Sequence, residues 1–223
     1  MSRIKNYNNR LENLRTERSS FINHWRELSD YHLGYRGRFL TSGRNKGYKR
    51  NTRVMNNTSF LATRTLASGM MAGITSPARP WFKLQAPDRE MNDYAPVKEW
   101  LHRVERMMYR VYSQSNTYNI LHTLYGDLGV FGTPSMGVYQ DYKNVIRCQS
   151  NPVGSFMLAT NGQDEVDTFY REYDRTVAQI EKQFGIDNVP VYIKELWNNN
   201  GSEQWFTCVH VIEPNDDRDT MSP

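Results

Sequence analysis

Apolar residues recur every three or four positions in the first part of the chain, which is the spacing of one face of an α-helix. These positions are Leu11, Leu14, Phe21, Ile22, Trp25 and Leu28, with Arg, Glu and Asn between them. The pattern predicts an amphipathic helix of about 20 residues that ends near Gly34, because glycine readily ends a helix in the left-handed conformation.

A second helix is predicted over residues 58–74, with an apolar side that consists of Phe60, Ala67, Met70, Met71 and Ile74. Gly69 and Gly73 lie four positions apart in it. The segment is too short to span a bilayer and contains Arg64, so we expect the two glycines to permit close packing against another element in water. Beyond Pro77 and Pro80, the residues from Trp81 to Leu84 are predicted to begin an extended, half-buried segment.

Two more helices follow the same rule. A helix is predicted over residues 93–112, and Pro96 is compatible with its first turn. Its buried stripe is predicted to consist of Val97, Trp100, Leu101, Val104, Met108 and Val111. The next helix starts near Thr117 and contains Tyr118, Leu121, Leu124 and Leu128. We expect it to end in the glycine-rich segment 126–137, whose glycines would form tight turns into a strand.

The apolar period shortens from residue 135 onwards, which predicts strands. Residues 137–140 and 145–149 flank a polar turn, and residues 155–160 and 166–173 flank Asn161-Gly162, so two hairpins are expected. A capping box of Thr176 and Gln179 predicts a short helix that ends at Gly185. A further short helical piece from Pro190 to Trp197 and a final strand over 204–212 complete the pattern.

These elements predict an α+β fold, in which N-terminal amphipathic helices precede antiparallel hairpins and short helices. We divide the chain into a mainly helical part, 1–134, and a β-rich part, 135–223. The strand over 204–212 is apolar and only a polar tail follows it, so we expect the polypeptide to be truncated.

The composition favours a folded chain with much polar surface, or one that neighbouring subunits help to bury. Apolar residues make up 38%, aromatic residues 13%, and the mean hydropathy is −0.75. No segment approaches the ~18 consecutive apolar residues of a transmembrane helix, so we expect no membrane contact. Cys148 and Cys208 lie far apart, which favours two reduced thiols.

The positive charge is concentrated in the N-terminal quarter of the chain. Residues 1–53 contain 13 Lys and Arg against 4 Asp and Glu, a net of +9, and the remaining residues carry 15 against 20, a net of −5. The basic loop 36–53 adds Phe39 and Tyr48 to its cations. This loop predicts contact either with nucleic acid or with an acidic neighbouring subunit. Its candidate contact residues are Arg36, Arg38, Arg44, Lys46, Lys49, Arg50 and Arg53.

We predict no enzyme, no catalytic residue, no resident metal and no cofactor. The sequence lacks the nucleophile-elbow, zinc-protease and phosphate-loop motifs. The glycine-rich segment 126–137 follows a predicted helix, whereas a phosphate-binding loop follows a strand. His24, Glu27 and His32 could supply metal ligands, but a solvated or interfacial helix face is the better interpretation. The acids Asp164, Glu165 and Asp167 fit a solvated hairpin tip better than a nuclease site.

Four ordered blocks resemble the portal (head-to-tail connector) proteins of short-tailed bacteriophages, the podoviruses related to phage T7. The blocks occupy residues 67–82, 125–133, 165–172 with the helix to Gly185, and 209–214. The resemblance covers roughly residues 10–214, nearly the whole chain.

The resemblance implies a homo-oligomeric ring of about twelve subunits at one capsid vertex, closed by identical contacts. Double-stranded DNA would be packaged and ejected through the channel of this ring, in a virion assembled in the host cytoplasm. The implied partners are other copies of the chain, capsid, scaffold, terminase and tail adaptor proteins. The chain would be chiefly the wing region, without the stem and clip that contact terminase and the tail. The alternative from the residues alone is a stand-alone nucleic-acid-binding protein that uses the basic N-terminal quarter.

Overall fold

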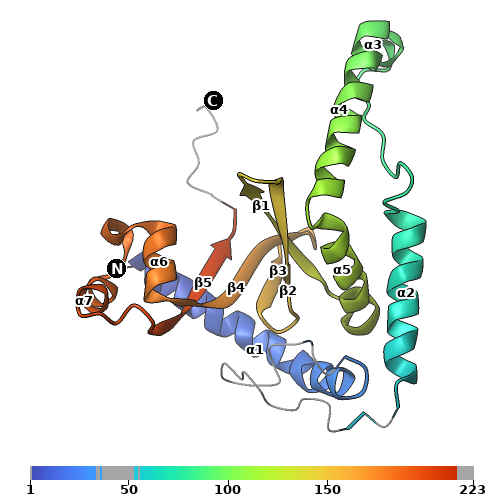
Figure 1. Ribbon diagram of the computed structural model, residues 1–223. Helices are drawn as coiled ribbons and strands as arrows, with labels where there is room; N and C mark the ends of the chain where they lie inside the picture. The colour runs from blue at the N-terminus through green and yellow to red at the C-terminus, as the bar shows by residue number, and fades with distance from the viewer. Residues whose placement is uncertain (1, 34–35, 37–52, 55, 215–223) are drawn as a thin grey trace. The chain divides into compact units, whose positions relative to one another are not determined.

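The computed structural model describes residues 2–33, 36, 53–54 and 56–214 (Figure 1). The predicted α+β class is confirmed: long helices come first, and antiparallel strands with short helices follow. The helices are α1 Ser2–Tyr31, α2 Thr58–Ile74, α3 Arg89–Asp93, α4 Ala95–Gln114, α5 Thr117–Phe131, α6 Val177–Phe184, the 3₁₀ helix η2 Ile186–Asn188 and α7 Val191–Asn198. The strands are β1 Ser135–Asp141, β2 Val145–Asn151, β3 Phe156–Thr160, β4 Val166–Thr176 and β5 Trp205–Ile212.

The chain forms two compact units. The sheet unit consists of Met1–Phe21 and Gly154–Pro223, and the helical unit consists of Ile22–Val153. Helix α1 is continuous and contributes residues to both units. A division at 134/135 separates the described helix-rich and strand-rich stretches of sequence, and as a domain boundary it stays a prediction.

The sheet unit is built on the antiparallel order β3-β4-β5. Tyr170 of β4 pairs with Val211 of β5, so both side chains lie on the same face of the sheet. Leu11 and Leu14 of α1 pack there against Tyr170 and Met157, which buries these four side chains almost completely. Each fully buried side chain of this size contributes about 1.5–3 kcal/mol, so this face fixes the first half of α1 to the sheet.

The other face of this sheet contacts the helices α6 and α7. Val177 and Ile180 of α6, Ile193 of α7 and Val189, which precedes α7, form a buried cluster with Phe206 and Cys208 of β5. The predicted capping box begins α6: the Thr176 side chain accepts from the Gln179 backbone, and the Gln179 side chain accepts from the Thr176 backbone. Gly185 follows the helix with a φ of 77°, a conformation that glycine adopts without strain.

Both predicted hairpins are present, and their turns use side-chain caps. In the β3–β4 hairpin the Asn161 side chain accepts from Gln163 N and Glu165 N, at 2.8 and 3.1 Å. Asp164 adopts the positive φ of 60° in this loop. In the β1–β2 hairpin the carboxylate of Asp141 accepts from Asn144 N at 3.2 Å. Asparagine and aspartate stabilise turns in this way because their side chains reach the backbone two to four residues ahead.

The helical unit has a small core around Leu33, Phe131 and Val153. Partly buried side chains of α1, α2 and α5 complete it, namely Trp25, Leu28, Phe60 and Val130. Thr75, after α2, and Tyr125 of α5 share a buried hydrogen bond of 2.9 Å. Trp25, Leu28 and Phe60 are positions that the apolar period predicts, whereas Phe131 and Val130 are not, and the predicted apolar residues Ile74 and Leu128 are exposed.

The prediction of close packing at Gly69 and Gly73 is wrong. A Cβ placed on either glycine would meet no atom of the described chain within 4 Å. The close approach of α2 and α5 occurs at Gly129, where a Cβ would lie 2.6 Å from Leu66 Cδ2. Gly126 and Gly129 both lie within α5. The glycine-rich segment forms a turn only from Gly132, whose φ is 77°.

Two helices differ from the prediction in their extent. Helix α1 has 30 residues and ends at Tyr31, so it is longer than expected and stops before Gly34. Helix α4 starts at Ala95 with Pro96 in its first turn and ends at Gln114, and the short helix α3 precedes it. The predicted burial of the α4 stripe is also wrong: α4 has no buried residue, and Trp100 is 60% exposed.

Candidate functional site

An extended segment lies along α4 and is held by side chains of that helix. The hydroxyl of Tyr109 accepts from the backbone nitrogens of Trp81 and Phe82, both at 2.8 Å, and donates to Phe82 O at 2.7 Å. The Phe82 ring stacks on Tyr109 at 4.4 Å, and Trp81 stacks on Tyr112 at 6.0 Å. The predicted half-buried extended segment is therefore present, and a phenol satisfies backbone groups that a strand partner would otherwise bind.

An apolar concavity of 470 Å³ opens between α4, α5 and the β1–β2 hairpin of the helical unit. Its lining comes from Val104, Met108 and Val111 of α4 and from Trp81, Val138 and Ile146, among others. The sequence predicts that these α4 residues face a core, whereas they are half-buried and line this concavity among the described residues. An apolar surface of this kind commonly marks a contact with another macromolecule.

Beside this concavity, α4 exposes a row of alternating large apolar and basic side chains, which we call the arginine stripe. It consists of Trp100, Arg103, Met107 and Arg110, spaced three and four residues apart on one side of the helix. Met107 is 53% exposed and also lines the concavity. Arg103 lies 3.7 Å from Glu99 in an exposed ion pair, which contributes little stability in water.

The two compact units carry opposite net charge. Residues 22–153 contain 18 Lys and Arg against 9 Asp and Glu, a net of +9. The residues of the sheet unit, 1–21 and 154–223, contain 10 against 15, a net of −5. The charge asymmetry of the sequence therefore coincides with the division into units, although the basic residues of α1 before Ile22 belong to the acidic unit.

The acidic residues of the sheet unit include an exposed group on and next to α7. Val191 and Tyr192 are 69% and 54% exposed, and Asp187 and Glu195 are exposed beside them in sequence. We call these four residues the acidic face of α7. Neither carboxylate forms an ion pair with any residue that the structure describes.

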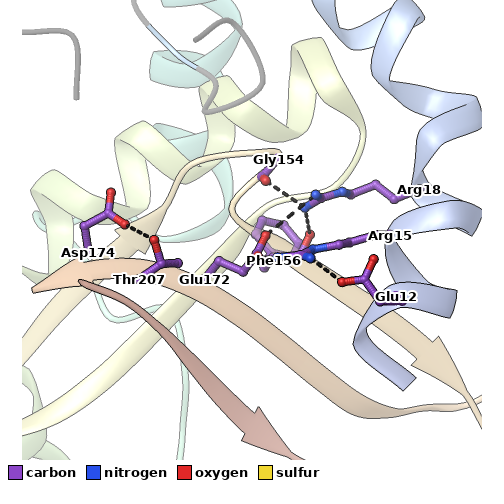
Figure 2. A network of polar contacts seen from close by, with 8 residues as sticks. All are labelled: Glu12, Arg15, Arg18, Gly154, Phe156, Glu172, Asp174 and Thr207. Atoms are coloured by element: carbon purple, nitrogen blue, oxygen red, sulfur yellow. Dashed lines mark hydrogen bonds and ion pairs between the residues drawn. The ribbon is translucent and has the colours of Figure 1, made fainter. Parts of the chain in front are cut away.

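Inside the sheet unit, two arginines of α1 pair with a glutamate of β4 (Figure 2). The carboxylate of Glu172 on β4 accepts from Arg15 and lies 3.8 Å from Arg18. Arg18 also donates to the carbonyl oxygens of Gly154 and Phe156, at 2.7 and 3.4 Å. The hydrogen bond to Glu172 raises the pKa of the Arg15 guanidinium above its usual value. These cations hold α1 on the sheet.

The sheet unit also has a concavity, of 1070 Å³, which is lined by residues of α1, β4 and β5. At its edge the Tyr170 hydroxyl donates to Glu213 at 3.0 Å, and burial together with this bond raises the pKa of Tyr170 to about 12. Burial also raises the pKa of the Cys208 thiol and lowers the pKa of His210, with Arg171 adding to the effect on His210. These pKa shifts keep the Tyr170 phenol, the Cys208 thiol and the His210 imidazole neutral near pH 7. They therefore do not activate a nucleophile.

The predicted basic-loop residues are only partly described. Arg36 forms a bidentate ion pair with Asp127 and also donates to Ser150, inside the helical unit. Arg53 is exposed and lies 3.4 Å from Asp30. Arg38, Arg44, Lys46, Lys49 and Arg50 lie outside the described residues, so contact of the loop with DNA or a neighbour stays a prediction.

No group of three His, Cys, Asp or Glu side chains in the described chain is arranged to hold a metal ion. His24 and Glu27 are exposed on α1, and His32 contacts Ser59. Across the part of the chain that is described, no helix has the length and apolar character needed to cross a membrane.

Comparison with known proteins decides the family. The model of the family described as "Bacteriophage head to tail connecting protein" matches residues 4–222. The chain belongs to this family. The head-to-tail connector resemblance seen in the sequence is thereby confirmed.

Two phage proteins whose names describe portals are similar to the chain. The chain is 47% identical over 210 residues to the portal protein of Salmonella phage epsilon15, an alignment that covers 94% of this chain and 38% of that protein. It is 46% identical over 206 residues to the probable portal protein of Bordetella phage BPP-1, which covers 92% of this chain and 37% of the relative. The chain therefore spans less than two fifths of the length of either relative.

The residues that the sequence interpretation missed are those whose role depends on exposure. The sequence pattern assigns Trp100 to a predicted core, and it assigns no role to Arg103 or to the acidic face of α7. The signal available in the sequence was the interleaving of Arg with Trp and Met on one helix. That signal indicates an interface only when the surrounding elements are known to leave it uncovered.

Proposed function

We propose that the protein is a structural head-to-tail connector, a portal whose copies form a ring at one capsid vertex. The observation that carries this proposal is the match of the connector family to residues 4–222, together with the portal proteins of two phages at 47% and 46% identity. A connector needs subunit contacts and a passage, and it needs no catalytic group. The family assignment thus agrees with a chain whose motifs suggest no chemistry.

The finer features of this role follow from the same proposal. The ring would contain about twelve copies, the number that the family resemblance implies, because identical head-to-tail contacts close into a ring when the rotation between subunits allows it. Double-stranded DNA would pass through its channel during packaging and ejection. Weak phosphate contacts that ignore base sequence would let the DNA slide. The protein would act in the virion after assembly in the bacterial cytoplasm, with capsid and tail proteins as partners.

The basic loop 36–53 is proposed to contact a neighbouring subunit, with DNA as the alternative target. The loop contains seven basic residues and no acidic ones, so its charge suits either an acidic surface of a neighbouring subunit or DNA. Arg36, the first of these basic residues, already binds Asp127 of its own chain through two hydrogen bonds. The proposed contact therefore depends on the residues after Arg36.

Measurement of the native mass of the full-length protein tests the proposed function, with mass photometry and negative-stain images as readouts. Rings of about a dozen copies without DNA are expected. A protein that remains monomeric at every concentration and binds duplex DNA with a steep salt dependence would contradict the connector role. That second result would favour a stand-alone nucleic-acid-binding protein, an alternative that neither the family nor the two relatives' names support.

A further inference from the structure

We infer that the arginine stripe of α4 binds the acidic face of α7 in a neighbouring copy of the chain. The inference deepens the proposed function and rests on it, because it names two surfaces that meet between copies in the ring. It concerns contacts between different molecules only. Three features of the molecule support it: apolar area on α4 that the described residues leave uncovered, the charge beside that area, and a complementary surface elsewhere on the chain.

The first observation is that α4 has apolar side chains that the described residues of the chain leave partly or largely uncovered. Trp100 and Met107 are 60% and 53% exposed, and the half-buried Val104, Met108 and Val111 of the same helix line the adjoining 470 Å³ concavity. A tryptophan has the largest apolar area of any side chain, and its burial against a partner is strongly favourable. A helix side this apolar is expected to be covered in the assembled protein.

The second observation is the charge at the edge of this apolar area. Arg103 and Arg110 lie on the stripe itself, and Arg106 is exposed close to them on the same helix. Glu99 is the one described acid in an ion pair with these arginines, and it pairs with Arg103 at the surface. A partner must therefore bring carboxylates or phosphates to the arginines as well as apolar side chains to Trp100 and Met107.

The third observation is that the sheet unit carries a surface of this kind. The acidic face of α7 combines the exposed apolar Val191 and Tyr192 with the carboxylates of Asp187 and Glu195. Exposed tyrosine and valine can fill an apolar concavity, and an amphipathic helix lying in a groove is a common mode of protein recognition. Carboxylates and guanidinium groups form directional, charge-assisted hydrogen bonds.

A second copy fits these observations better than DNA does. A DNA duplex offers phosphates to Arg103 and Arg110, but its surface has no apolar side chains for Trp100 and the concavity. The net charges of +9 and −5 make the helical unit of one copy attractive to the sheet unit of another. The two surfaces differ, so the contact is head-to-tail, and contacts of this type close into rings when the rotation allows it.

Charge reversal in the full-length protein tests the inference. Arg103→Glu with Arg110→Glu is expected to abolish ring formation or to shift it at least tenfold in protein concentration, and Asp187→Lys with Glu195→Lys should do the same. Because the four changes exchange the signs of the two surfaces, the quadruple variant is expected to recover rings. The matched controls are Lys143→Glu, in the β1–β2 turn, and Glu165→Lys, in the β3–β4 loop, which are exposed and lie outside both surfaces.

A photo-crosslinking residue gives a second readout that does not depend on charge. With p-benzoylphenylalanine in place of Trp100, illumination of assembled rings is expected to link neighbouring copies, and mass spectrometry should place the links within residues 187–197. Links that form only elsewhere would overturn the inference. Circular dichroism of each variant establishes that it is folded.

The outcomes separate this inference from the proposed function. If the wild-type protein forms no ring, the connector role itself is contradicted. If the wild type and both charge-reversal pairs form equally stable rings, only the contact between α4 and α7 is wrong. If Arg103→Glu with Arg110→Glu leaves the rings intact but weakens binding of duplex DNA, the stripe is a DNA contact and the inference fails.

Discussion

The guanidinium of Arg36 binds the carboxylate of Asp127 through two of its nitrogens, although the residues are 91 positions apart in sequence. The Asp127 side chain is only 2% exposed, and Ser150 on β2 binds the same guanidinium. This pair joins the segment after α1 to α5 and the β1–β2 hairpin. A residue that the charge pattern assigns to an external contact thus has a structural partner inside the helical unit.

Asp127→Ala is expected to destabilise the protein by about 3–5 kcal/mol, because it leaves the partly buried Arg36 without its counter-ion. Urea unfolding followed by circular dichroism measures the change. Replacement of both partners, Arg36→Met with Asp127→Leu, is expected to recover much of the loss, since neither charge then remains unpaired. An unchanged unfolding midpoint for Asp127→Ala would show that the pair contributes nothing.

Thr176→Ala removes the side-chain acceptor that caps the Gln179 backbone nitrogen at the start of α6. A loss of about 1 kcal/mol in the free energy of unfolding is expected, which is typical of a lost N-cap. Thr176→Ser keeps the hydroxyl and is the matched control, so it should retain most of the stability. Equal losses in both variants would place the effect in the packing of the Thr176 methyl group and not in the cap.

Stability is expected to decrease between about pH 10 and pH 12 through Tyr170. Burial and the bond to Glu213 raise the pKa of this phenol from 10.0 to about 12, so the folded state favours the protonated form. The stabilisation linked to that proton is complete below pH 10 and is lost as the pH rises through the folded value, by at most ~2–3 kcal/mol. Unfolding midpoints at pH 9 and pH 11.5 measure it.

Tyr170→Phe supplies the comparison for this pH dependence. The variant lacks the titrating group, so the difference in stability between the wild type and the variant should shrink as the pH rises over that interval. A difference that stays constant would contradict the assignment to Tyr170.

Replacement of Arg44, Lys46, Lys49 and Arg50 by Glu is expected to impair ring assembly, because the basic loop is proposed to bind an acidic neighbouring subunit. The defect should be larger at low salt, where repulsion between the reversed loop and that neighbour is screened least. Mass photometry over a series of salt concentrations measures the effect. Normal rings at every salt concentration would exclude this role for the loop.

Features fixed by neighbouring residues could be predicted from the sequence. The capping box at Thr176, the helix end at Gly185 and the two hairpins each depend on side chains within a few positions of one another. The α+β class follows from the same local periods. Family membership could also be predicted, because it depends on ordered blocks of residues and not on their contacts.

Features fixed by distant residues could not be predicted. The apolar period of α4 indicates that one side of the helix is suited to burial, but it cannot show whether the chain itself covers Trp100. The pairing of Arg36 with Asp127 requires tertiary structure to bring the two together. The close helix contact lies at Gly129 and not at Gly69 or Gly73, because the position of Leu66 decides which glycine is needed.

The exposure of Trp100 gives the protein an intrinsic optical signal. An indole in water emits at longer wavelengths than one in an apolar environment, so a free subunit should carry a red-shifted component from Trp100. The Trp81 indole, by contrast, lies among Phe82, Tyr109 and Tyr112. Assembly that covers α4 would move the Trp100 emission towards the blue, and the kinetics of ring formation could then be followed in unlabelled protein.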